Sequence, residues 1–145
     1  MVVAAAPEVI PQLAGKPYRD TIWGVSDVAR TSAEVYEQLV THEYGHHIHV
    51  GSYERVDSTI QRAFLMACPD RVAQMTAANL AGIEVARVEP ENAPEGAASV
   101  YGTTNHLEFF AEAFTAWHHQ HGWLKANKPI AYNMVKRVLE VLHGS

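Results

Sequence analysis

Six residues, Thr-His-Glu-Tyr-Gly-His at positions 41–46, limit the possible folds of this chain more than any other stretch. The surrounding segment, residues 31–50, carries apolar residues at helical spacing. On a helix, His42 and His46 lie one turn apart on the same face, about 6 Å along the axis. Both imidazoles can then bind one zinc ion, and Glu43 can reach a water on that ion. The alternative is an ordinary buried helix with two packed histidines.

Composition limits the classes of protein that remain. The chain has 145 residues, of which 48% are apolar, enough for one domain with a core and too few for two. We therefore expect a single domain over residues 1–145, with a flexible lead at 1–16. The net charge of −5 argues against nucleic acid or an anionic membrane surface as the main partner. Cys68 is the single cysteine, so any metal must be bound by histidine and carboxylate.

The sequence carries no strong targeting signal. It contains no run of about 18 apolar residues, so we expect no membrane-spanning segment. Residues 1–11 are apolar but do not have the basic segment and cleavage site of a signal peptide. These features are compatible with a cytoplasmic protein, with export by a signal-independent route, or with a domain cut from a longer chain.

The third metal ligand is expected on a second helix. The metzincin pattern needs a glycine three residues and a histidine six residues after His46, but those positions hold His49 and Ser52. Further along the chain, an aromatic-rich helix would carry Glu108 and Glu112 four residues apart on one face. Carboxylates on so apolar a helix are costly to bury without a cation or a hydrogen-bond donor. Zinc would satisfy Glu108, and the far ring nitrogen of a zinc-bound histidine would satisfy Glu112. Two solvated glutamates are the alternative.

The same helix belongs to a longer motif, Tyr-Gly-x-Thr-Asn-x-x-Glu-Phe-Phe-Ala-Glu-Ala-Phe, at residues 101–114. Together with His-Glu-x-Gly-His at 42–46, this motif resembles the lethal-factor-like group of bacterial zinc endopeptidases, which includes anthrax toxin lethal factor and the Pro-Pro endopeptidases. The resemblance covers the helix at 31–50 and most of the chain from Ser99 onward. It implies His42, His46 and Glu108 as the ligands of one zinc ion, Glu43 as general base, Tyr101 as the phenol that stabilises the oxyanion, and Glu112 as support for a ligand.

The chain departs from this family before the motif helix. Only 30 residues precede position 31 here, whereas the family's domain brings more sheet before that helix. We expect a small, mostly helical α+β zincin with a short β-sheet against the active-site helix. The best strand candidate is residues 17–25, in which Ile22, Trp23 and Gly24 would pair with an extended substrate. A strand that merely covers the core is the alternative.

The rest of the chain has the pattern of core-forming helices. Apolar spacing predicts helices at 58–67, 70–80 and 127–142, the first of them capped by Asp57. Leu65 and Leu80 are expected to face the core.

The sequence therefore predicts a zinc-dependent endopeptidase that hydrolyses a protein or peptide substrate with a zinc-activated water. One alternative is a zincin-fold domain that acts in processing within a larger toxin, effector or phage protein. Another is a non-catalytic binding module of the same fold. Glu43 and Tyr101 argue against the binding module, since a protein that only binds a partner needs neither.

Overall fold

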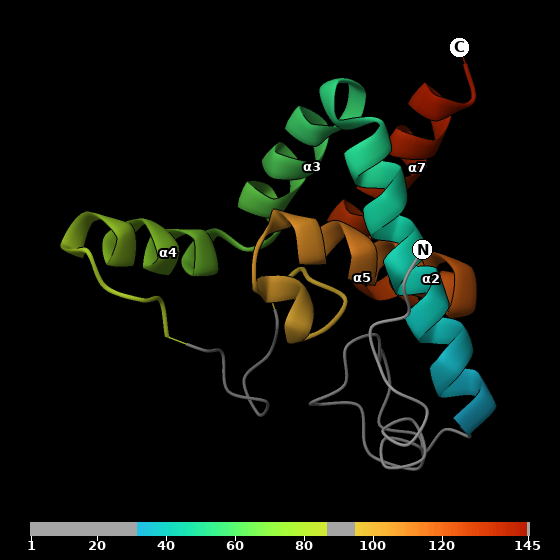
Figure 1. The fold of residues 1–145 in the computed structure, drawn as a ribbon, viewed down its shortest axis with the longest axis horizontal. Coiled ribbons are helices and arrows are strands. Elements are labelled where there is room, and N and C mark those ends of the chain that lie inside the picture. Colours follow the sequence, from blue (N-terminus) through green and yellow to red (C-terminus); the bar gives the residue numbers. More distant parts are fainter. Residues whose placement is uncertain (1–31, 87–94, 145) are drawn as a thin grey trace.

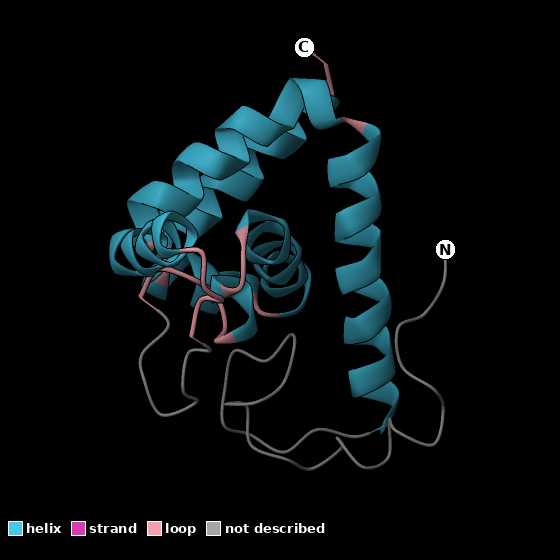
Figure 2. Cartoon of the chain, turned by 60° about the vertical axis from the view of Figure 1, so that its left-hand side comes forward, coloured by secondary structure: helices cyan, strands magenta, loops and turns pink. Residues whose placement is uncertain are grey.

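Every element that the computed structural model describes is helical. The structure describes residues 32–86 and 95–144. In Figure 2 these ranges form helices joined by loops, with no strand among them. The elements are α2 (Ser32–Gly51), α3 (Tyr53–Ala67), α4 (Pro69–Ala81), the 3₁₀ turn η2 (Tyr101–Thr103), α5 (His106–His119), α6 (His121–Asn127) and α7 (Pro129–Leu142).

The predicted α+β class with a short β-sheet is wrong, because the described residues form an all-α fold. The helix that was expected to lie against a sheet, α2, packs against another helix, α5. A sheet was expected by analogy with a family, whereas the apolar residues of the described ranges recur at helical spacing and bury helical faces. The strand predicted at 17–25, with Ile22, Trp23 and Gly24, lies outside the described residues, as does the flexible lead at 1–16.

Local sequence signals set several helix boundaries. The helix predicted at 31–50 is confirmed by α2, which differs by one residue at each end. Pro69 occupies the first turn of α4, where its missing N–H costs nothing. Gly82 ends α4 in the left-handed conformation, with φ of 70°. Asn105 caps α5, since its side chain accepts a hydrogen bond from the backbone N–H of Glu108 at 2.9 Å.

The start of α3 differs from the prediction. This helix begins at Tyr53 rather than at residue 58, so Asp57 lies inside it and is not its cap. Ser52 alone separates α3 from α2, and its backbone N–H still donates to the carbonyl of Ile48 at 3.0 Å. The last turn of α2 is therefore held next to the first turns of α3.

The central helix of the fold is α5, which contacts α2, α3, α6, α7 and η2 (Figure 1). All residues from Phe109 to Ala116 are buried, as expected for a helix surrounded by others. The Phe64 and Phe109 rings pack with their centroids 5.3 Å apart and join α3 to α5. Besides these two, the core includes the large apolar side chains of Val56, Ile60, Phe110, Phe114, Leu124, Met134, Val135 and Val138.

Helix α4 packs against α3 and extends away from the other helices in Figure 1. Its residue Leu80 is 86% exposed, and Leu65 on α3 is also exposed. The predictions that these two leucines face the core are therefore wrong, because α4 extends away from the other helices and Leu65 lies on the exposed face of α3. Arg71 near the start of α4 is buried and faces the body of the fold.

Candidate metal centre

Helices α2 and α5 bring two histidines and a glutamate together. The Nε2 atoms of His42 and His46 lie 3.0 and 2.8 Å from Oε1 of Glu108, and 3.1 Å from each other. We call these three side chains the His42 cluster. The two histidines share one face of α2, and the glutamate lies in the first turn of α5. The structure thus brings together the three residues that the sequence predicts as ligands.

The chemistry and spacing of the His42 cluster fit a divalent cation. Bonds of about 2.0–2.1 Å at tetrahedral angles place neighbouring donor atoms roughly 3.3 Å apart. The three donor atoms here are 2.8 to 3.1 Å apart, so small outward shifts suffice to admit an ion. The His42 side chain is buried, whereas those of His46 and Glu108 are 25% and 17% exposed. The open side leaves room for a water or a substrate at the metal.

The three side chains also influence each other's charge. Burial disfavours a charged imidazole, but hydrogen bonds to Glu108 and Glu112 outweigh it and raise the pKa of His42 to about 9. Burial likewise disfavours the ionised Glu108, but hydrogen bonds from His42 and His46 lower its pKa to about 2. Glu108 is therefore negatively charged at neutral pH, as a metal ligand must be. A cation that binds Nε2 of His42 displaces a proton from it, so metal binding releases protons.

A buried carboxylate fixes the ring of His42 from behind. Oε2 of Glu112 lies 2.7 Å from Nδ1 of His42, and the hydroxyl of Ser99 donates to the other oxygen of Glu112. The backbone N–H of Gly102 donates in turn to the Ser99 hydroxyl at 3.0 Å. Burial raises the pKa of Glu112 to about 7, although contact with His42 opposes this shift. This chain of contacts holds the imidazole with Nε2 directed at the cluster.

The sequence analysis did not identify Ser99 as part of the site. It lies 13 residues before Glu112 and in a different element, and no spacing rule connects the two. The only signal is its position immediately before the motif at 101–114.

Tyr101 and Glu43 lie at the edge of the His42 cluster. The Tyr101 hydroxyl donates to Oε2 of Glu108 at 3.2 Å, and its ring centroid is 5.9 Å from that of His42. Burial raises the pKa of Tyr101 to about 12, and the charges of Glu108, Glu112 and Glu43 act in the same direction. The phenol therefore stays protonated and able to donate. Glu43 follows His42 on α2, is partly exposed and lies close enough for its charge to act on the phenol.

The turn that carries Tyr101 is tied to the start of α4 by a buried arginine. Nε of Arg71 donates to the carbonyl of Thr103 at 2.8 Å, and Nη1 donates to that of Ala86 at 2.6 Å. The backbone N–H of Gly96 also donates to the carbonyl of Ala67 at 2.9 Å. These bonds hold the segment before α5 in place. The sequence analysis missed Arg71, since a single arginine on a helix gives no sign that it binds a distant loop.

Gly45, between the two histidines, permits the close approach of α2 and α5. A Cβ atom at this position would lie 3.2 Å from Cα of Ala111 and 3.2 Å from Cδ2 of Phe114. Both distances are shorter than ordinary van der Waals contacts. The glycine therefore lets the backbones approach until the side chains of His42 and Glu108 meet.

Comparison of the chain with protein-family models, with curated proteins and with solved structures finds no match. The assignment of a function therefore depends on the geometry of the site. Most of the site residues predicted from the sequence lie together, namely His42, His46, Tyr101, Glu108 and Glu112. Glu43 lies beside them. The predicted substrate-binding residues Ile22, Trp23 and Gly24 lie outside the described residues.

Proposed function

We propose that this chain is a zinc-dependent endopeptidase of the lethal-factor-like type. The observation that carries the proposal is the convergence of His42, His46 and Glu108 on one point from two packed helices. A fold alone would not support an activity, but this donor set also has the flanking groups that peptide hydrolysis requires.

The three residues of the His42 cluster would hold the zinc ion, and Glu112 would orient the His42 ring. Two imidazoles with one carboxylate form a ligand set that is known for catalytic zinc, with a position left for water. When bound, zinc supplies Lewis-acid chemistry, since it polarises a carbonyl group and lowers the pKa of a bound water to about 7.

The proton transfers belong to Glu43. It adjoins the ligand His42 in the sequence and is partly exposed, so it can contact both solvent and a bound peptide. In this role its carboxylate accepts the proton of the attacking water and then gives it to the leaving amine. Such a general base contributes typically 10²–10⁴-fold to the rate.

Tyr101 is proposed to stabilise the negative charge that develops on the peptide carbonyl oxygen. Its pKa of about 12 keeps the phenol a hydrogen-bond donor throughout the neutral range. Tyr101 is 38% exposed, and its hydroxyl donates to Glu108, so the phenol lies beside the cluster where a substrate could reach it. A donor aimed at the transition state rather than at the ground state raises kcat.

The proposed substrate is a protein or peptide that approaches from the exposed side of the His42 cluster. Among the described residues, no helix is sufficiently long and apolar to cross a membrane. The net charge of −5 does not favour nucleic acid as a partner. The domain is compatible with a place in a larger polypeptide, in which it would cleave a target or its own precursor.

The test is hydrolysis of a peptide library by zinc-loaded wild-type protein, by Glu43→Gln and by Glu37→Gln. Glu37 is an exposed glutamate on the same helix and serves as the matched control. We expect Glu43→Gln to lose about 10²–10⁴-fold in kcat with its zinc retained, and Glu37→Gln to keep the wild-type rate. Equal rates for the two variants would contradict the proposed role of Glu43. No cleavage by the wild-type protein, with zinc bound, would favour a binding module instead.

A further inference from the structure

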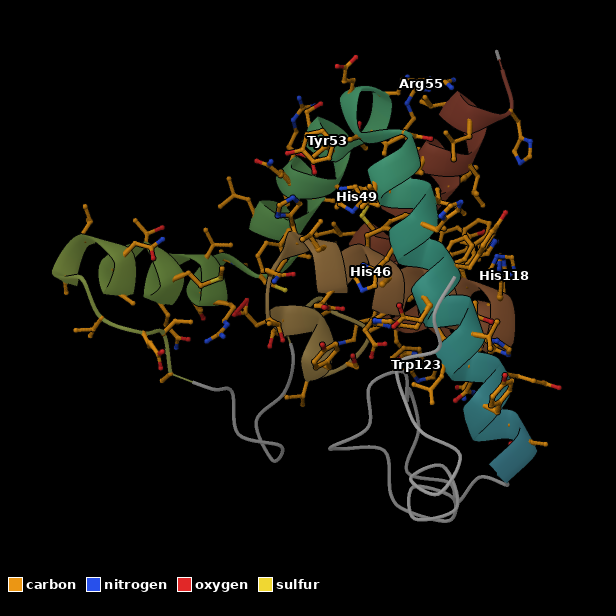
Figure 3. The ribbon with its side chains drawn as sticks, in the orientation of Figure 1. His46, His49, Tyr53, Arg55, His118 and Trp123 are labelled. Carbon is orange, nitrogen blue, oxygen red and sulfur yellow. The ribbon has the colours of Figure 1, made fainter. Side chains whose placement is uncertain are left out.

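A second group of metal-binding side chains lies one turn further along α2. Nε2 of His49 and Nε2 of His106 lie 2.7 and 2.9 Å from the same oxygen, Oδ1 of Asp57. The donor atoms of all three residues lie within 4.8 Å of one another. We call them the His49 cluster. In Figure 3, His49 and His46 both lie on the side of α2 that faces the other helices.

Three helices supply the His49 cluster, and the fold explains why they meet. His49 lies in the last turn of α2, and Asp57 lies in α3, which starts just after the one-residue connection at Ser52. His106 is the first residue of α5, the central helix. Asp57 and His106 are 49 positions apart in the chain, and the packing of the core brings them together.

The buried position of His49 directs its chemistry toward the cluster. The residue is fully buried, and its Nδ1 atom has no hydrogen-bond partner among the described residues. Its polar contact is thus made through Nε2, toward Asp57. The rings of Phe110 and Tyr53, with centroids 5.7 and 6.0 Å away, hold the imidazole in this orientation.

The alternative for the His49 cluster is a purely hydrogen-bonded carboxylate. Asp57 also accepts a bond from Nε2 of Gln61, at 2.6 Å to Oδ2, so its second oxygen is already satisfied. Oδ1, in contrast, contacts two imidazoles, in each case through the Nε2 atom of the ring. Two imidazole nitrogens and one carboxylate oxygen form the same donor set as the His42 cluster, at similar spacing. The His106 side chain is 26% exposed, so water can reach the cluster.

We propose that the His49 cluster binds a second divalent cation of the zinc type, through Nε2 of His49, Oδ1 of Asp57 and Nε2 of His106, with water completing the coordination. Imidazole and carboxylate ligands at this spacing suit zinc better than calcium or magnesium, which take oxygen ligands. Because the ligands come from three helices, this ion would link the end of α2 and the start of α3 to the start of α5. Its expected role is to stabilise the fold.

The experiment measures bound zinc on metal-stripped chains of residues 1–145 after equilibrium dialysis against Zn²⁺. We expect two equivalents in the wild type and one each in Glu108→Gln and His106→Gln, because each variant loses one of the two sites. The double variant is expected to bind none. His143→Gln, which removes an exposed histidine near the C-terminus, is the control and is expected to keep two. The same number of equivalents in the wild type and in His106→Gln would overturn the proposal, whatever that number is.

Thermal unfolding gives a second readout that does not depend on the His42 cluster or on peptidase activity. In the Glu108→Gln background, added Zn²⁺ should raise Tm, since an ion that binds only the folded state stabilises it. Further addition of His106→Gln or Asp57→Asn should remove this rise. If Zn²⁺ raises Tm equally in the single and double variants, the His49 cluster does not bind the ion. Either result leaves the proposed peptidase function unaffected, because activity is not measured.

Discussion

The His42 cluster and the His49 cluster contain the same three chemical groups but differ in their surroundings. In each, one histidine is buried and the other is partly exposed. The Nε2 atoms of both rings lie within hydrogen-bonding distance of one carboxylate oxygen. Behind His42, however, Glu112 contacts the far ring nitrogen and Ser99 donates to Glu112, whereas the far nitrogen of His49 has no partner within the described ranges. The first histidine is fixed by hydrogen bonds and the second by aromatic packing.

This difference separates a candidate catalytic site from a candidate structural one. Tyr101 donates to Glu108 of the His42 cluster and Glu43 lies next to it, so the proposed oxyanion donor and the proposed proton acceptor both flank this cluster. The His49 cluster instead joins three helices near a one-residue connection. The identity of the ligands therefore does not determine what a metal site does, whereas the residues around the ligands do.

The largest expected effect comes from Glu108→Gln. This change removes the carboxylate that joins α5 to the histidines of α2, so the His42 cluster should lose its zinc and peptide hydrolysis should stop. His106→Gln, two residues away, should retain that zinc and lower Tm instead. Zinc analysis, a peptide-cleavage assay and thermal unfolding of the two variants would test this contrast. Cleavage of the peptide by Glu108→Gln at the wild-type rate would show that the His42 cluster does not take part in hydrolysis.

Tyr101→Phe should have the next largest effect, on turnover. Loss of one oxyanion donor costs about 10²–10³-fold in kcat, and zinc should remain bound. The comparison is Tyr53→Phe, since Tyr53 stacks on His49 in the second cluster. The kcat of Tyr53→Phe should fall far less. Similar losses in both variants would mean that Tyr101 acts on the fold rather than on the transition state.

Glu112→Gln should weaken zinc binding at the His42 cluster. Loss of a partner behind a ligating histidine typically costs 10–100-fold in metal affinity. Competition with a chromophoric chelator measures the affinity, and the Glu108→Gln protein gives the value for the second cluster alone. Unchanged affinity in Glu112→Gln would show that packing suffices to orient His42, as it does for His49.

The smallest expected effect is that of Gly45→Ala on stability. The added Cβ meets Ala111 and Phe114 at 3.2 Å, and overpacking of this kind costs about 1–3 kcal/mol. Alanine's greater helix propensity offsets about 1 kcal/mol of this loss in the free energy of unfolding. Gly51→Ala is the matched control in the same helix, because a Cβ there has no neighbour within 4 Å. Urea unfolding should give a lower free energy of unfolding for Gly45→Ala, and one no lower than wild type for Gly51→Ala.

Much of the helical framework could be predicted from local patterns. The spacing of apolar residues predicts α2, and the aromatic-rich segment with Glu108 and Glu112 on one face predicts α5. The sheet was wrong because it came from analogy and not from an alternating pattern within the described ranges. The convergence of Glu108 with the two histidines could be anticipated, since a carboxylate on an apolar helix needs a partner.

Contacts that cross the fold could not be predicted. Ser99 and Arg71 act through bonds to distant elements, and neither residue type is unusual where it stands. The His49 cluster was missed because Asp57 was expected to cap a helix that in fact begins four residues before it. Because α3 begins at Tyr53, Asp57 lies within the helix and contacts His49, but the sequence gives no sign of this earlier start.

The long chain separation within the His42 cluster has a consequence for biosynthesis. His46 and Glu108 are 62 positions apart, and the support for His42 comes from 70 positions away. While the chain emerges from the ribosome, both histidines are therefore present well before the carboxylates that complete their environment. A nascent chain that ends before α5 has two ligands and no third, so firm metal capture must wait for the second half of the domain. Under the proposed function, zinc binding at the His42 cluster, and proteolysis with it, would begin only after the chain has been made through α5.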